Sequence, residues 1–211
     1  MKKEKSMGSI SLRIAAFFLI ALSAAGIYWM ISVSFGNKND LPVLGEPGHR
    51  AGSFSFINQD GNRVTEKTVE NKVTVVEYFF TSCPSICPRM NKNLQVIYEE
   101  FKRTPDFMIL SHTVDPGNDT VAVLKAYASR FDAKAPGWQF LTGDKNALYA
   151  SAVQDYLLAA ADSGAAPFIH TQYVALVDKS RRIRGVYDMT SRENILKLNA
   201  AIRQLLTEKP D

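Results

Sequence analysis

The pattern of apolar and polar positions separates one long apolar segment near the N-terminus from a region of short alternating elements. Residues 14–35 contain no charged side chain, and as a helix they would extend over about 33 Å, enough to cross a hydrocarbon core of about 30 Å. The basic residues before this segment predict a cytoplasmic N-terminus, with the rest of the chain across the membrane. The alternative is a cleaved signal peptide. Apolar residues continue well past the small residues at 21–25, however, which favours a single-pass anchor.

Beyond the linker, apolar segments alternate with segments of helical periodicity. The segments 73–80 and 107–114 are typical of strands buried on both faces. Further strands are predicted at 54–58, 138–141, 173–177 and 183–187. Helices are predicted at 89–101, from Asn118 or Asp119 to 131, from Asp144 to 156, and from a capping box at Thr190 and Glu193 to 206. This order predicts an α/β fold with a mixed sheet flanked by helices, in a thioredoxin-like arrangement.

These elements divide the chain into four parts: a basic cytoplasmic tail at 1–13, a transmembrane anchor at 14–35, a linker at 36–51 and the α/β domain at 52–211. The linker is rich in glycine, proline, asparagine and charged residues, which is typical of a flexible connection. We therefore expect a protein of the bacterial cytoplasmic membrane, with its domain facing the periplasm or the cell exterior.

The net charge of +4 is concentrated at the N-terminus. Four basic residues and one acidic residue at 1–13 give +3, which leaves +1 for the remainder of the chain. No basic stripe with interleaved aromatic residues occurs in the body of the sequence, which argues against nucleic-acid binding. The basic run of Lys179, Arg181, Arg182 and Arg184 is interpreted as the solvated face of a hairpin.

The chemistry of the sequence centres on Cys83 and Cys87, its two cysteines, at the junction of a buried strand and a helix. The N–H groups and dipole at a helix N-terminus stabilise a thiolate and lower its pKa. A separation of three residues can put both sulfurs on one side of a helical turn, where two thiolates and an imidazole would suit Cu(I). Zinc in a structural site usually takes four ligands, and a fourth is hard to find here. A plain disulfide and a redox-active pair both remain alternatives.

Three histidines compete for the role of third ligand. His49 lies in the linker and is interpreted as a solvated residue, whereas His112 lies in a strand and is interpreted as a satisfied core or edge histidine. His170 precedes the strand at 173–177, where a loop can deliver a side chain to a neighbouring site, which favours it over the other two. Met90 and Met189 could offer thioethers, but packing explains them equally well.

The motifs together resemble the Sco/SenC family of copper-delivery proteins in cytochrome c oxidase assembly. The matching segments are Tyr78–Pro88 around the two cysteines, Thr113–Pro116 with Asp119 and Thr120, Leu124–Ala128, Trp138–Gly143, and His170–Thr171 ahead of Leu176–Asp178. The resemblance extends over roughly residues 45–206. It implies a thioredoxin-like domain that binds one copper ion through Cys83, Cys87 and His170. Departures occur at Ile169, where many members have an acidic residue, and at Gly117–Asn118 of the Asp-Pro turn.

The resulting hypothesis is a membrane-anchored copper metallochaperone that delivers copper to a copper-containing subunit of a respiratory oxidase. The alternative is an extracytoplasmic thiol-disulfide oxidoreductase, which needs only Cys83 and Cys87. Outside the cytoplasm a cysteine pair tends to form a disulfide bond unless a metal ion or a thiol reductant partner prevents it.

Overall fold

The computed structural model describes residues 13, 16–17, 19–28, 41–158 and 172–210. The chain divides into two compact units, Met1–Asp40 and Leu41–Asp211. In the first unit, the described residues between 13 and 28 are helical. None of the helices within the described residues combines the length and apolar character needed to span a membrane. The predicted anchor at 14–35 lies partly outside the described residues and stays a prediction.

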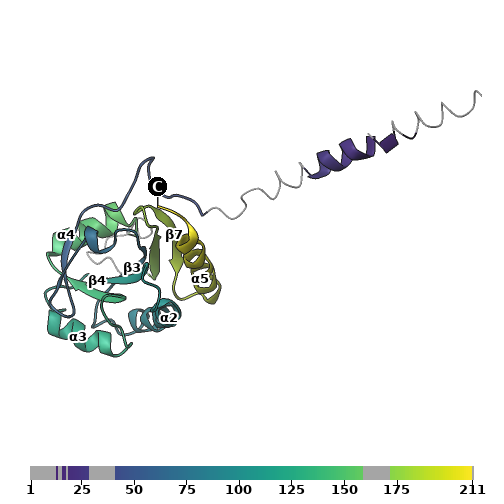
Figure 1. Cartoon of the computed structure of the whole chain (residues 1–211). Coiled ribbons are helices and arrows are strands. Elements are labelled where there is room, and N and C mark those ends of the chain that lie inside the picture. Colours follow the sequence, from purple (N-terminus) through teal and green to yellow (C-terminus); the bar gives the residue numbers. More distant parts are fainter. Residues whose placement is uncertain (1–12, 14–15, 18, 29–40, 159–171, 211) are drawn as a thin grey trace, which may run out of the picture. The chain divides into compact units, whose positions relative to one another are not determined.

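In the second unit, the described residues form a seven-stranded mixed sheet flanked by helices (Figure 1). The strands are β1 (Ser55–Asn58), β2 (Arg63–Thr65), β3 (Val73–Phe79), β4 (Phe107–Thr113), β5 (Trp138–Thr142), β6 (Tyr173–Val177) and β7 (Ile183–Asp188), in the order β2-β1-β5-β4-β3-β6-β7. The central strands β3, β4 and β5 are parallel, and the outer pairs are antiparallel. The α/β prediction with a mixed sheet is confirmed.

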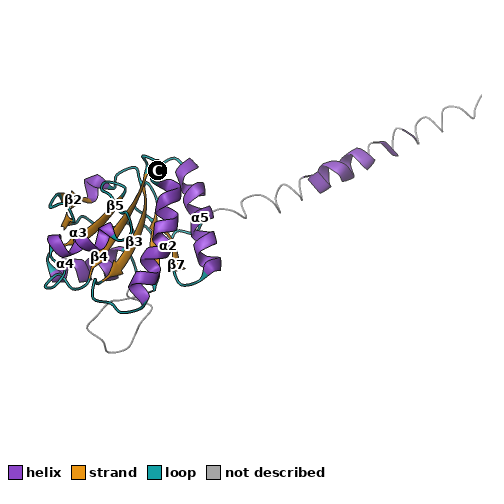
Figure 2. Cartoon of the chain, turned by 90° about the horizontal axis from the view of Figure 1, so that it is seen from below, coloured by secondary structure: helices purple, strands orange, loops and turns teal. Residues whose placement is uncertain are grey.

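The helices cover both faces of this sheet (Figure 2). They are α2 (Ile86–Phe101), α3 (Val121–Ser129), α4 (Lys145–Ala150) and α5 (Arg192–Thr207), with a 3₁₀ turn at Glu66–Thr68 and a π-helical turn at Ser151–Asp155 after α4. Side chains of α2, α3 and α5 share one hydrophobic core, and those of α4 share the other. Alternate residues of β3 enter the two cores, Val75 and Phe79 on the α2 side and Val76 and Tyr78 on the α4 side. The described residues of both cores lie within residues 41–211, and a hydrophobic core of its own is the mark of a domain that can fold independently.

Two helices begin later than the sequence predicts, α3 by one or two residues and α5 by one. The cap of α3 is Thr120, whose hydroxyl accepts a hydrogen bond from the N–H of Val123, rather than Asn118 or Asp119. The cap of α5 is Ser191 rather than Thr190. In the second case the local geometry differs, because the N–H and hydroxyl of Thr190 both donate to the carboxylate of Asp188, which directs the Thr190 side chain toward Asp188.

The residues at 41–51, which the composition assigns to the linker, pack against the domain. Leu44 forms an antiparallel bridge with Ile183, and the N–H of Ala51 donates to the carbonyl of Arg181 at 2.8 Å. The guanidinium of Arg184 donates to the carbonyls of Leu41 and Pro42 at 2.9 and 3.1 Å.

Arg184 also corrects the interpretation of the basic run as a solvated face. It is only 5% exposed, and its Nη1 pairs with Asp178 at 3.1 Å and with Glu208 at 2.7 Å. Lys179 likewise turns inward and donates to the carbonyls of Leu206 and Glu208. Arg184 and Lys179 therefore connect the hairpin to residues 41–42 and to the end of α5.

Candidate metal centre

The two cysteines lie between the end of β3 and the first turn of α2, at the carboxyl end of the sheet. The N–H of Cys83 donates to the carbonyl of Phe80 at 3.2 Å, which turns the chain after the strand. α2 begins at Ile86, so Cys87 is its second residue, and the N–H of Cys87 points at the Cys83 sulfur over 3.4 Å. Cys83 is 7% exposed and Cys87 is 1% exposed, and both are free thiols. The predicted strand-to-helix junction is confirmed.

The helix N-terminus makes the two thiols unequal. Burial alone would raise the pKa of Cys83, but the backbone N–H groups of Cys87, Ser85 and Ile86 and the Cys87 thiol more than offset it, and the pKa lies below its ordinary value. Burial raises the pKa of Cys87 far above its ordinary value, and the neighbouring Cys83 sulfur raises it further. Cys83 is therefore the more readily ionised sulfur.

Asp119 holds the loop that carries Cys83. Its carboxylate accepts hydrogen bonds from the N–H of Thr81 at 3.2 Å, from the Thr81 hydroxyl at 2.5 Å, and from the hydroxyl of Thr113. The N–H of Asp115 in turn donates to the Thr113 hydroxyl at 3.0 Å. Asp119 thus joins the Asp-Pro turn to the cysteine loop. These contacts give the physical reason why it does not cap α3.

A buried carboxyl group lies near the cysteines, and sequence reasoning misses it. Glu77 is fully buried, and the hydroxyl of Ser111 on β4 donates to its Oε1 at 2.5 Å, while the indole N–H of Trp138 donates to Ser111 at 2.8 Å. Burial raises the pKa of Glu77 to about 8. The signal in the sequence is a single acidic residue within the apolar run 73–80.

The structure describes two of the three histidines. His112 is a core residue as predicted; neither ring nitrogen makes a well-aligned hydrogen bond with a described residue, although the backbone of Glu77 lies close enough to raise its pKa in part. His49 is not simply solvated, since its Nε2 lies 3.0 Å from the carbonyl oxygen of Asp155. His170 falls outside the described residues, and its role as third ligand stays a prediction. Within the described part of the chain, no cluster of three or more His, Cys, Asp or Glu side chains is arranged to hold a metal ion. Met90 and Met189 are buried in the α2-side core.

Comparison with known proteins identifies the family. The SCO1/SenC family model matches residues 44–207. The chain belongs to the SCO1/SenC family. The resemblance that the sequence motifs indicate is therefore confirmed, and the match extends over most of the Leu41–Asp211 unit.

Curated relatives carry the same family name. The SCO1 protein homolog of Bacillus subtilis is 35% identical over 91 residues, which cover 43% of this chain and 47% of that protein. Protein SCO1 homolog 1, mitochondrial, of Arabidopsis thaliana is 34% identical over 140 residues, covering 61% of this chain and 41% of that protein. The chain thus spans less than half the length of these two relatives.

Solved Sco structures share the fold. BsSco, described as a member of the Sco family of cytochrome c oxidase assembly proteins, matches with a TM-score of 0.65 and 24% identity over 76% of this chain and 95% of that one. Bradyrhizobium japonicum ScoI with copper bound matches with a TM-score of 0.59 and 23% identity over 74% and 99% of the two chains. At these identities the likeness establishes the thioredoxin-like Sco fold and nothing finer.

Proposed function

We propose that this chain is a membrane-anchored copper metallochaperone that delivers Cu(I) to the copper-containing subunit of a respiratory oxidase. Two free thiols at the β3–α2 junction of a SCO1/SenC domain carry this proposal, because structural relatives of that family have copper bound. Cys83, Cys87 and His170 are the proposed ligands. Two thiolates and an imidazole are the soft and borderline donors that Cu(I) prefers.

The unequal thiols are compatible with a cargo site. A cysteine must lose its proton to bind a metal ion, so copper binding releases protons into solution. Cys83, with its lowered pKa, is the natural first ligand, and Cys87 ionises as the ion arrives. A site with few protein ligands also leaves room for an incoming ligand of the acceptor, which ligand exchange requires.

The same asymmetry favours a second function, a thiol-disulfide oxidoreductase. The Cys83 thiolate would attack a disulfide of the target, forming a mixed disulfide and releasing one target thiolate. Cys87 would then attack Cys83, releasing the second target thiolate and leaving a Cys83–Cys87 disulfide. Two electrons pass to the target, and an external dithiol must restore the pair. The two functions are compatible, because a target whose ligands are thiolates must be reduced before it can accept copper.

Copper stoichiometry separates the two functions. The fragment 41–211, reduced and loaded with Cu(I) without oxygen, should retain one copper ion per chain after desalting. Cys83→Ser and His170→Ala should lose or weaken it, whereas His49→Ala is the matched control and should bind as the wild type does. Absence of copper from the reduced wild type would refute the chaperone. Disulfide reductase activity that survives in His170→Ala would then identify the oxidoreductase.

A further inference from the structure

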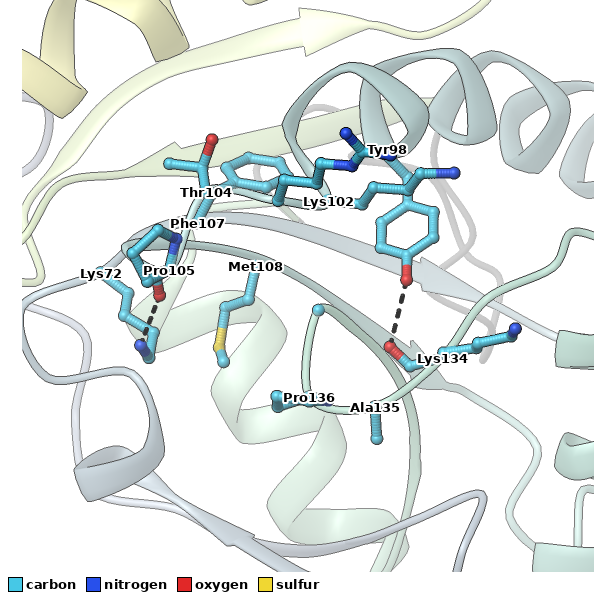
Figure 3. Close-up of a pocket in the computed structure, with 12 residues that line it drawn as sticks. Lys72, Tyr98, Lys102, Thr104, Pro105, Phe107, Met108, Lys134, Ala135 and Pro136 are labelled. Carbon is cyan, nitrogen blue, oxygen red and sulfur yellow. Dashed lines mark hydrogen bonds between the residues drawn. The ribbon is translucent and has the colours of Figure 1, made fainter.

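A basic pocket, shown in Figure 3, lies where β3 and β4 begin. Its volume is about 260 Å³, and its basic lining residues are Lys72, Lys102, Arg103 and Lys134. Lys72 precedes β3 and Phe107 begins β4, and these two parallel strands are paired from Val73 and Phe107 onward. Cys83 follows the other end of β3. The length of the central strands therefore separates the pocket from the cysteines.

The pocket combines cationic groups with an apolar wall. The Lys72 ammonium donates to the carbonyl of Pro105 at 2.7 Å, which keeps its charge at the rim. Lys102 is paired with Glu99, but Arg103 and Lys134 make no ion pair with any described residue. Pocket-lining residues that lie between the charged groups are uncharged and include Phe107, Met108 and Pro136 (Figure 3). No acidic residue is among the described residues that line it.

The N-terminal segment enters the domain at this same end of the sheet. β6 runs antiparallel to β3 with Val177 opposite Thr74, so the hairpin that follows Val177 lies beside the start of β3. That hairpin holds Leu41 through Arg184, and Lys179 of the same hairpin approaches Asp106 at 3.9 Å, directly before Phe107. The chain that leads back to residues 14–35 therefore leaves from the end that carries the basic pocket.

We propose that the basic pocket docks on anionic phospholipid headgroups of the membrane in which residues 14–35 would anchor the chain. The cysteines then face away from the lipid. This inference rests on the proposed anchor, not on copper binding. A Lys or Arg near an anionic membrane surface strengthens binding roughly fivefold. The attraction decays within a Debye length of about 10 Å at 0.1 M salt, so basic residues at the cysteine end contribute little. A tether at the same end keeps the pocket at high local concentration over the lipid.

The test is co-sedimentation of fragment 41–211 with vesicles of phosphatidylcholine, alone or mixed with phosphatidylglycerol. The wild type should sediment with the anionic vesicles only. Arg103→Gln/Lys134→Gln should lower the partition coefficient roughly 25-fold, at about fivefold per charge. Both side chains are exposed, so this double variant should fold normally. The charge-matched control, Lys92→Gln/Lys197→Gln, removes two exposed lysines from α2 and α5 outside the pocket and should bind nearly as the wild type does.

Three results would overturn the proposal: no binding to anionic vesicles, equal losses in the two double variants, or full displacement by millimolar inorganic phosphate. The second would mean that net charge alone drives binding, and the third that the pocket is a site for free phosphate. Copper stoichiometry is measured separately on the same proteins. A failure of docking is therefore distinguishable from a failure of the proposed function.

Discussion

Acid should destabilise the domain through a single buried imidazole. The ring of His112 lies nearly parallel to that of Tyr78, with centroids 4.9 Å apart, and edge-on to that of Phe56 at 5.5 Å. Burial lowers the pKa of His112 from 6.5 to about 3, because an imidazolium there would lose its hydration, and the backbone of Glu77 offsets only part of this loss. At neutral pH the ring is uncharged in the folded and the unfolded chain alike, so it carries no electrostatic penalty.

The magnitude follows from proton linkage. Between pH 6.5 and about 3 the unfolded chain holds a proton on His112 that the folded chain lacks. The free energy of unfolding therefore falls as pH falls, by about 1.4 kcal/mol per pH unit. The loss is about 3 kcal/mol by pH 4.5 and about 5 kcal/mol near pH 3. Losses of this size are a large part of the 5–15 kcal/mol that stabilises a typical domain.

Urea unfolding of fragment 41–211, reduced and metal-free, measures this effect between about pH 4.5 and 7.5. His112→Phe preserves an aromatic ring in the stack but cannot take up the proton. The difference in unfolding free energy between wild type and variant removes the contribution of every other titrating group. It should be constant above pH 6.5 and change by about 1.4 kcal/mol per unit below it. Parallel curves would refute the reasoning, and His112→Gln provides the same comparison if the phenylalanine variant does not fold.

Three further changes test the other buried polar groups. Burial raises the pKa of Glu77 from 4.5 to about 8, so the wild type loses stability as pH rises through that range. Glu77→Gln cannot ionise, and its free energy of unfolding relative to the wild type should therefore rise by about 3 kcal/mol between pH 4.5 and pH 7. The same urea series measures this difference. Asp119→Asn removes the charged acceptor that holds the cysteine loop. It should lower the free energy of unfolding by about 2 kcal/mol, measured by thermal unfolding, and weaken Cu(I) binding, measured by competition with a chelator. Arg184→Met should lower the free energy of unfolding by about 2 kcal/mol and speed proteolysis near Leu41, because it removes the donor to the carbonyls of Leu41 and Pro42 and one of the two guanidinium partners of the Asp178 carboxylate.

Each of these changes has a matched control. For Glu77→Gln the pH dependence is itself the control, since a stabilisation independent of pH would indicate altered packing instead. Asp115→Asn alters a carboxylate whose side-chain partner is the exposed Asn118, and an equal loss of copper affinity there would contradict the assigned role of Asp119. Arg192→Gln removes an exposed arginine at the start of α5, and proteolysis accelerated as much by it would contradict the role of Arg184.

The elements that follow from local pattern are predictable. Long apolar runs such as 73–80 become central strands because both faces are buried, and this pattern alone places the cysteines at a strand-to-helix junction. The side chains that depend on distant partners are not predictable in this way. Asp119 has the spacing of a helix cap, yet its carboxylate accepts hydrogen bonds from Thr81, which lies 38 residues away in the sequence. Arg184 belongs to a run that looks solvated, yet its partners are Asp178, Glu208 and the carbonyls of Leu41 and Pro42.

Histidine roles show the same limit. Pattern alone places His112 in a strand, but only the structure shows that the rings of Tyr78 and Phe56 pack against its imidazole. Ranking His170 above the others rests on its position before β6 and on family resemblance. A ligand contributed by a loop depends on how that loop crosses the site, which neither periodicity nor spacing encodes.

The backbone bridge between Leu44 and Ile183 bears on the self-association of this protein. β7 ends the sheet, and the unpaired backbone groups of a terminal strand are a template onto which another chain can add. The N–H of Leu44 donates to the carbonyl of Ile183 at the start of β7, so that this edge group is paired. The guanidinium of Arg184 donates to the carbonyl of Leu41 and keeps the preceding residues beside the same edge. A fragment cut at Gly52 would lose this cover and should self-associate at concentrations where a fragment beginning at Leu41 stays monomeric. We therefore expect residues 41–51 to protect the edge of the sheet from pairing with another chain.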